Sequence, residues 1–268
     1  MLVIAALRWV DPRPGVDPLT GAVHTDPKAS GPSAADECAL AHALRIAGPG
    51  RCVAVTAGPP AAEGLLRDAL AAGATDALRI DDAGANTAVA LTAGIRTLGP
   101  PDVIVCGDHS LDHGTGATPA LLAHAFGAAQ ALGLVELSMD GELTGLRRLD
   151  GGRRERLAIP LPAVCSVEPT GLRPPRASLP AVLAAQAAAI PVVTVDSGPS
   201  MVQAGEQKPY RPRPTHLGAP AGDAHHRVLA LTGALTERTP PRVVRPASAA
   251  EAADELLDFL RKHGFLEP

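Results

Sequence analysis

A polar loop in the middle of the chain holds the residues best suited to bind a ligand. Residues 107–118 read G-D-H-S-L-D-H-G-T-G-A-T and lie between an apolar run at 103–106 and a helical pattern. Glycines permit close backbone approach, and the free N–H groups and positive dipole end of a helix attract phosphate. Ser110, Thr115 and Thr118 add hydroxyl groups. The loop is therefore a candidate phosphate site. An ordinary polar strand–helix loop is the alternative, because the segment is neither a Walker loop nor a GxGxxG motif.

The same loop has side chains that could ligate a metal. His109 and His113 would share one face only if the loop were helical, and the flanking glycines disfavour a helix. We expect no metal there, nor at the histidine pair 225–226, which lies in a Pro/Gly-rich stretch. The chain has no nucleophile elbow and no Ser–His–Asp arrangement with a supporting context. The sequence therefore predicts no catalytic residue.

Short apolar runs alternate with helical patterns over the first half of the chain. Such runs are typical of strands buried on both faces, and the alternation is typical of a parallel, doubly wound sheet. The predicted fold class is α/β, with a Rossmann-like, mostly parallel sheet and, later in the chain, added antiparallel strands. Ligands bind such sheets at the carboxyl ends of the strands, here near Ala5, Ala57 and Gly107. The predicted strands are 2–7, 52–57, 77–80 and 103–106, the predicted helices are 33–47, 61–72, 86–98 and 119–126, and 9–30 is expected to be a long loop.

The second half of the chain has a different pattern. Antiparallel strands are expected at 134–139, 142–149 and 155–159, followed by a strand at 162–167 and a helix at 179–188. Residues 191–246 are rich in Pro, Gly and Arg, and a loop of that length is unusual inside a domain. A capping box, Ser248 with Glu251, predicts a last helix over 249–263. We therefore expect a nucleotide-binding domain at 1–190 and an arm at 191–268 that packs on a partner subunit.

Composition excludes several classes of function. The 268 residues carry a net charge of −4 without long runs of one sign, so neither nucleic acid nor an anionic membrane is an expected partner. The four cysteines lack metal or redox spacing, and Cys52, Cys106 and Cys165, which lie in strand-like apolar runs, are expected to be inert core thiols. The start has no basic region followed by a cleavage site, and no apolar stretch reaches the roughly 20 residues that span a bilayer. We expect a cytoplasmic protein.

Several motifs together resemble the electron-transfer flavoprotein β-subunit (FixA-like) family. They are collinear with that family from residue 2 to about 190. The most specific is R-R-L-D-G-G-R-R-E-R-L-A-I-P-L-P-A-V at 147–164, a charged strand, an Asp-Gly-Gly turn and a strand ending in Leu-Pro-Ala-Val. The others are L-V-I-A-A-L-R-W-V-D at 2–11, S-A-A-D-E-C-A-L-A-H-A-L-R at 33–45, V-A-V-T-A-G-P at 53–59, R-D-A-L-A-A-G-A-T-D-A at 67–77, the loop 107–118, and R-A-S-L-P at 176–180. The Pro/Arg arm and the ending H-G-F-L resemble a branch associated with mycofactocin-type redox systems.

The resemblance implies a heterodimer. An α-type partner would hold most of the redox FAD, and this chain would hold an AMP. The pair would carry electrons from a donor dehydrogenase to a quinone reductase or similar acceptor. Leu179 and Pro180 would recognise the donor. The nucleotide-contacting positions carried over are Ala5, Ser33, Ala34, Ala35, Asp36, Ala57, Gly107, Asp108, His109, Ser110, Leu111, Asp112, His113, Gly114, Thr115, Gly116, Ala117 and Thr118.

The chain also departs from the family pattern. Ser33, Ala34 and Ala35 stand where the family often has Asn-Pro-Phe, and Gly116-Ala117 precede Thr118 where the family has Asn-Gln. Two alternatives therefore stay open. One is a bifurcating-type subunit that holds a second FAD in this chain, although the scarcity of aromatic residues favours a flavin site shared with a partner. The other is a stand-alone nucleotide-binding regulatory module.

Overall fold

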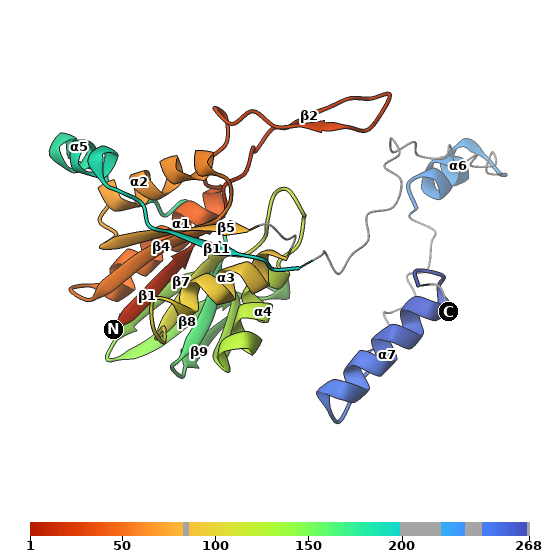
Figure 1. The fold of residues 1–268 in the computed structure, drawn as a ribbon. Helices are drawn as coiled ribbons and strands as arrows, with labels where there is room; N and C mark the ends of the chain where they lie inside the picture. The colour runs from red at the N-terminus through yellow and green to blue at the C-terminus, as the bar shows by residue number, and fades with distance from the viewer. Residues whose placement is uncertain (83–85, 199–220, 234–242, 267–268) are drawn as a thin grey trace. The chain divides into compact units, whose positions relative to one another are not determined.

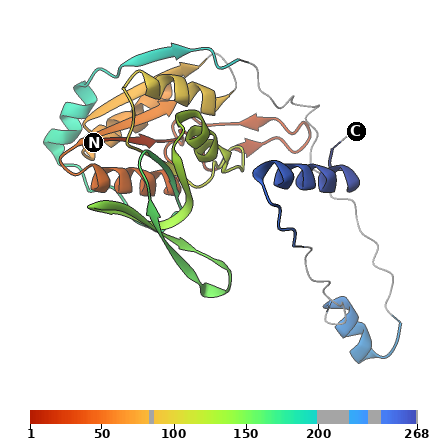
Figure 2. The ribbon, with the colours of Figure 1, turned by 90° about the horizontal axis from the view of Figure 1, so that it is seen from below.

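One mixed sheet organises the first part of the chain in the computed structural model (Figures 1 and 2). The structure describes residues 1–82, 86–198, 221–233 and 243–266. The chain divides into two units, Met1–Tyr210 and Arg211–Pro268. The sheet and the helices on its two faces belong to the first unit, and two separate helices belong to the second.

The sheet has the order β11-β5-β4-β1-β6-β10-β7-β8-β9. Every neighbouring pair from β11 to β7 is parallel, and β8 and β9 extend the sheet in antiparallel fashion. The predicted α/β fold, with a doubly wound, mostly parallel sheet and added antiparallel strands, is therefore confirmed. The strands are β1 (Leu2–Ala6), β4 (Arg51–Ala57), β5 (Asp76–Asp82), β6 (Val103–Gly107), β7 (Ala129–Asp140), β8 (Glu142–Arg148), β9 (Arg154–Ile159), β10 (Ala163–Val167) and β11 (Val192–Val195).

Helices cover both faces of the sheet because its strands are apolar on both sides. Along β1, Val3 and Ala5 belong to the core beneath α1 and α2, whereas Ile4 and Ala6 belong to the core beneath α3 and α4. Helix α5 packs on α2 rather than on the sheet (Figure 1). The helices of this unit are α1 (Ala34–Ala47), η1 (Pro60–Ala62), α2 (Glu63–Ala71), α3 (Thr87–Arg96), α4 (Ala117–Phe126) and α5 (Leu179–Ala187).

Capping side chains set the helix starts where the sequence predicts them. Ser33 Oγ accepts from the Asp36 N–H, and Asp36 Oδ2 accepts from the Ser33 N–H, which completes a capping box at α1. Asn86 caps α3 by accepting from the Val89 N–H, and Ser178 caps α5 by accepting from the Ala181 N–H. Each cap satisfies an N–H group that the helix itself leaves without a partner.

Two segments expected to be irregular contain strands. Within 9–30, β2 (Gly15–Val16) and β3 (Val23–His24) form a short antiparallel hairpin. The expected long loop is thus wrong in part, because the alternation that marks a strand is not visible in two-residue strands. Within 191–246, β11 pairs in parallel with β5, so the sheet continues past residue 190 and the first unit extends to residue 210.

The second unit contains two helices. These are α6 (Ala224–Leu231) and α7 (Ala249–Lys262). Ser248 Oγ accepts from the Glu251 N–H, so Ser248 caps α7 as predicted, but the Glu251 carboxylate accepts from the Ala247 N–H at 2.6 Å instead of completing the predicted capping box. Among the described residues of this unit, neither helix has a buried side chain. The apolar residues Leu256, Leu257 and Phe259 of α7 are exposed. Packing of this unit on a partner subunit stays a prediction.

None of the helices in the described ranges combines the length and apolarity needed to cross a membrane.

His42 makes the stability of the first unit dependent on pH. Its ring is buried in α1, and Nδ1–H donates to the Leu137 carbonyl oxygen at 3.1 Å. Burial is the main cause that lowers the pKa of His42 below its ordinary value of 6.5. Its contribution to stability is therefore fully present above pH 6.5 and is lost as pH falls through the lower folded-state pKa.

We expect His42→Asn to flatten the slope of unfolding free energy against pH in the range below pH 6.5, measured by urea unfolding. His124→Asn, at an exposed position, controls for the removal of a histidine that is not buried. An unchanged slope in His42→Asn would contradict this assignment.

Candidate functional site

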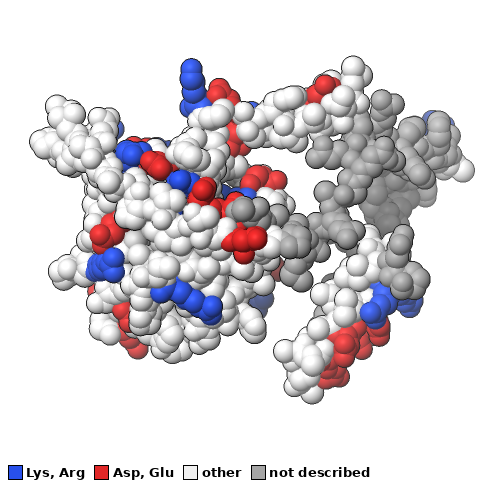
Figure 3. All heavy atoms as spheres, in the orientation of Figure 1, with Lys and Arg blue, Asp and Glu red and all other residues white. Residues whose placement is uncertain are grey.

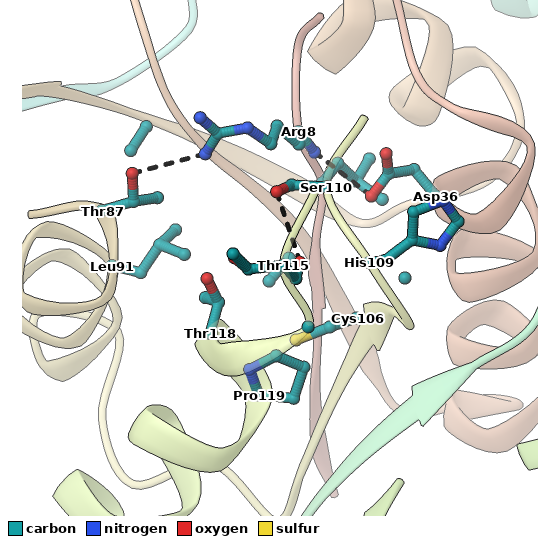
Figure 4. Close-up of a pocket in the computed structure, with 15 residues that line it drawn as sticks. Arg8, Asp36, Thr87, Leu91, Cys106, His109, Ser110, Thr115, Thr118 and Pro119 are labelled. Carbon is teal, nitrogen blue, oxygen red and sulfur yellow. Dashed lines mark hydrogen bonds between the residues drawn. The ribbon is translucent and has the colours of Figure 1, made fainter. Parts of the chain in front are cut away.

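A pocket lies at the carboxyl ends of β1, β4 and β6 (Figure 4). The sheet order places β1 between β4 and β6. The chain runs from β1 to β4 on one side and later returns to β6 on the other, so this edge is the topological switch point at which doubly wound sheets bind ligands. The lining residues are Ala6, Leu7, Arg8, Asp36, Ala57, Thr87, Leu91, Cys106, Gly107, His109, Ser110, Thr115, Gly116, Thr118 and Pro119.

Helix α4 begins at this pocket with no side-chain cap. Its N-cap residue is Gly116, and no side chain accepts a hydrogen bond there. The first N–H groups of a helix lack intrahelical partners and carry the positive end of its dipole. Thr118, in the first turn, adds a hydroxyl to the pocket wall. The helix begins at Ala117, two residues before the predicted start, because proline is tolerated in a first turn and Pro119 does not delay it. This end of the pocket suits an anion.

The loop before α4 is folded back on itself by its own backbone. Ser110 N–H donates to the Thr115 carbonyl oxygen at 2.8 Å, and Gly114 N–H donates to the Ser110 carbonyl oxygen at 2.8 Å. Gly114 has a φ of 63°, which favours glycine. A Cβ on Gly116 would lie 2.5 Å from the Asp108 carbonyl oxygen. The loop can therefore close toward α4 only because residue 116 has no side chain.

Arg8 follows β1 and joins the two walls of the pocket. Its Nε donates to both carboxylate oxygens of Asp112, at 2.7 and 2.9 Å, and Nη1 donates to Thr87 Oγ1 at 3.3 Å. Burial opposes ionisation of Asp112, but the hydrogen bonds and charge of Arg8 outweigh it and hold the pKa of this carboxyl below its usual range. The loop after β6 is thereby tied to the end of β1 and to the start of α3.

Asp36 connects helix α1 to the same strand end. Its Oδ2 accepts from Ser33 Oγ at 2.6 Å, and its Oδ1 accepts from the Arg8 N–H at 3.3 Å. Burial raises the pKa of Asp36, and the bonds from Ser33 and Arg8 oppose that rise. Gly107 allows α1 to approach, because a Cβ there would lie 3.1 Å from the Ala35 Cβ and 3.3 Å from Asp36 Oδ1. Asp36 thus holds the backbone of Arg8 in place.

The structure brings most of the predicted nucleotide-contacting residues to this edge but not all into the pocket. Ala5 is buried within β1, and Ala35 packs beneath the pocket. Asp112 does not line the pocket, but it pairs with Arg8, which does. Among the predicted residues, the pocket lining includes Asp36, Ala57, Gly107, His109, Ser110, Thr115, Gly116 and Thr118, and it does not include Ala5, Ser33, Ala34, Ala35, Asp108, Leu111, Asp112, His113, Gly114 and Ala117.

Several lining residues were not predicted. Thr87 and Leu91 come from α3, which no motif connects with the loop after β6. Arg8 directly follows the predicted strand 2–7, and Cys106 is the last residue of the predicted strand 103–106, so both lie at the strand ends where a ligand was expected. Cys106 is buried, and burial raises the pKa of its thiol above its usual range. It serves as an apolar part of the pocket floor.

The two residues predicted to recognise a donor lie elsewhere. Leu179 and Pro180 start α5, which packs on α2, and neither lines the pocket. Leu179 is 70% exposed. Its exposure leaves it accessible, and its role in donor recognition stays a prediction.

The part of the chain that the structure describes contains no cluster of metal-binding side chains. Among the described residues, no three His, Cys, Asp or Glu side chains lie close enough together to hold a metal ion. Instead, His109 Nδ1 lies 2.8 Å from Asp108 Oδ1. Acidic and basic side chains are interspersed on the face of the first unit that Figure 3 shows.

Comparison with known proteins places this chain in a family. A family model described as "Electron transfer flavoprotein domain" matches residues 21–197. The electron transfer flavoprotein subunit beta of Chromohalobacter salexigens is 30% identical over 253 residues, covering 92% of this chain and 91% of that protein. The proteins of the same name from Mycobacterium tuberculosis and Mycobacterium bovis are 32% identical over 153 residues, and the match spans only 57% of their length and 54% of this chain. On these matches, the chain belongs to the electron transfer flavoprotein beta-subunit family.

Proposed function

We propose that this chain is the β-type subunit of a cytoplasmic, heterodimeric electron carrier and that its pocket holds AMP as a structural nucleotide. The α-type partner holds the redox FAD. The pair accepts electrons from a donor dehydrogenase and delivers them to a quinone reductase or a similar acceptor. The association with mycofactocin-type redox systems belongs to the same proposal. The observation that carries the nucleotide assignment is the uncapped start of α4 facing a pocket at the switch point of the sheet.

The chemistry of the pocket supports an adenine mononucleotide. Apolar side chains from the strand ends and α3, including Leu7, Ala57 and Leu91, offer contacts for a flat base. The start of α4, with Thr118, offers N–H and hydroxyl donors for one phosphate. In this assignment the chain's own residues bind and orient the nucleotide, and none acts as acid, base or nucleophile.

Two exposed surfaces support a role in an assembly. Helix α5 exposes Leu179 and Leu183, and α7 exposes Leu256 and Phe259. Exposed apolar groups gathered on single helices are typical of protein–protein contacts. We assign α5 to the donor dehydrogenase and the second unit to the α-type subunit.

The nucleotide content of the assembly tests this function. The chain is co-expressed with an α-type subunit, the purified complex is denatured, and the released nucleotides are quantified by chromatography. We expect one FAD and one AMP per pair. Two FAD without AMP would replace this proposal with a bifurcating-type subunit. A chain that binds nucleotide but forms no pair with any α-type subunit would favour a stand-alone regulatory module.

A further inference from the structure

One side chain in the segment after β11 is bonded both to the end of β5 and to the start of α3. Ser197 Oγ donates to Asp82 Oδ2 at 2.7 Å, and the Ser197 N–H donates to Asp82 Oδ1 at 3.0 Å. The same Oγ accepts from the Asn86 N–H at 2.9 Å. Asp82 ends β5, and Asn86 is the N-cap residue of α3. Ser197 with Asp82 and Asn86 is called the α3 clip below.

The α3 clip joins segments that are far apart in the chain. Ser197 is 115 residues from Asp82 and 111 residues from Asn86. In the preceding strand β11, Val193 and Val195 pack against the core that lies beneath α3. Residues 193–197 therefore hold α3 in two ways, by apolar packing along the strand and by hydrogen bonds at the start of the helix.

The helix start that the clip holds forms one wall of the pocket. Thr87, next to Asn86, and Leu91, one turn further along α3, both line the pocket (Figure 4). Thr87 Oγ1 also accepts from Arg8 Nη1 at 3.3 Å, which connects this wall with the end of β1. Movement of the first turn of α3 would therefore displace Thr87 directly and loosen the wall that Leu91 completes.

The hydroxyl of Ser197 suits this task because it acts as donor and acceptor at once. The first N–H groups of a helix have no partners within the helix, so a helix start that nothing holds can open locally. Without the hydroxyl, the Asn86 N–H loses its bond to the clip, and Asp82 keeps only the bond from the Ser197 N–H. A ligand that contacts this wall must then order it on binding, and that cost lowers its affinity.

We propose that Ser197 is a positioning residue of the nucleotide pocket: its hydroxyl fixes the first turn of α3 to the end of β5 and so holds the Thr87–Leu91 wall against the bound nucleotide. Ser197 does not line the pocket, so it acts through α3 and not by touching the ligand. This inference rests on the proposed function, since the ligand is the nucleotide of the same pocket. It makes a residue of the region 191–268, which the sequence assigns to an arm, part of the binding unit.

The affinity of the full chain for AMP tests the clip. Dissociation constants are measured by calorimetry for wild type, Ser197→Ala and Ser197→Thr. We expect Ser197→Ala to weaken AMP binding about three- to tenfold, because two hydrogen bonds at the start of α3 are lost. Ser197→Thr keeps the hydroxyl, so its affinity should stay within about twofold of wild type. An equal loss in both variants would contradict the proposal, because the hydroxyl would then not be the group that matters.

A double-mutant cycle with Thr87 separates positioning of the wall from a general loss of stability. Thr87→Val removes the hydroxyl of the pocket wall. Because Ser197 acts by holding Thr87 in place, the two substitutions should be coupled. Ser197→Ala combined with Thr87→Val should weaken AMP binding at least about twofold less than the product of the two single effects. Independent effects that multiply would show that Ser197 does not act through the start of α3.

Ser138→Ala is the matched control. Ser138 Oγ lies 2.9 Å from Thr144 Oγ1 in the β7–β8 pair, and Ser138 is half-buried, as Ser197 is. Neither Ser138 nor Thr144 lines the pocket, so this variant should keep the AMP affinity of wild type. Thermal unfolding of each variant establishes that it is folded at the temperature of the titration. Asp82→Asn weakens the same clip, should also weaken AMP binding, and carries the test if Ser197→Ala is not folded.

The AMP titrations distinguish a failure of the clip from a failure of the nucleotide site. Wild-type AMP affinity in Ser197→Ala would overturn the role of Ser197 and leave the nucleotide site standing. Absence of AMP binding by wild type, both alone and in complex with an α-type subunit, would overturn both proposals.

Discussion

Gly116→Ala is expected to weaken AMP binding by about ten- to hundredfold, which corresponds to ~1.4–2.8 kcal/mol. The added Cβ would lie 2.5 Å from the Asp108 carbonyl oxygen, a backbone atom that cannot move without the loop. Gly116 is also the N-cap residue of α4. Relief of the clash must therefore displace either the loop or the first turn of the helix. Both belong to the end of the pocket that we assign to the phosphate.

Calorimetric titration of the full chain with AMP measures this effect. Gly64→Ala in α2 is the matched control, because a Cβ at Gly64 has open space and the pocket lies elsewhere. Its AMP affinity should equal wild type, and its stability should stay within about 1 kcal/mol of wild type. Wild-type affinity in Gly116→Ala would mean that the loop accommodates the methyl group or that the phosphate does not bind at α4.

Leu122→Ala is expected to lower the unfolding free energy of the first unit by about 2–5 kcal/mol. Leu122 lies on α4, is 0% exposed and belongs to the core between α3, α4 and the sheet. Its truncation removes apolar contacts and leaves a cavity that the surrounding strands fill only in part. Since α4 also supplies one end of the pocket, a loosened α4 should weaken AMP binding as well.

The neighbouring Leu121 provides a control on the same helix. It is 50% exposed, so Leu121→Ala should change the unfolding free energy by less than about 0.5 kcal/mol. Urea unfolding monitored by far-UV circular dichroism measures both variants, with the α-type subunit absent so that the stability of this chain alone is compared. Equal effects of the two substitutions would show that α4 does not pack on the sheet through Leu122.

Gly116→Ala tests the contacts that form the pocket, and Leu122→Ala tests the packing that supports it. Leu122 anchors α4 to the sheet, and Gly116 lets the preceding loop reach that helix. Loss of AMP with unchanged stability in Gly116→Ala, together with loss of stability in Leu122→Ala, would separate the contacts that form the pocket from the packing that supports it.

Local patterns in the sequence determined most elements of this protein. Ser33 with Asp36 and Ser248 with Glu251 mark helix starts because a cap and its partner lie within one turn. Apolar runs such as 103–106 predict buried strands because the pattern is complete within a few residues. The strand–helix alternation also indicates a parallel sheet, whose carboxyl edge is where a ligand binds. The position of the pocket could therefore be predicted before the structure.

The composition of the pocket was decided by tertiary structure. Arg8 meets Thr87 and Asp112 through contacts 79 and 104 residues apart, and no local pattern encodes such a pairing. The edge strand β11 is similar: its four residues become a strand by pairing with β5, more than 100 residues earlier. Conversely, Ala5 lies on a strand that reaches the pocket, yet the pleat and the neighbouring strands bury it. Capping and strand patterns act over a few residues, whereas the walls of a pocket form where distant segments meet, so only the packed chain decides which side chains face the ligand.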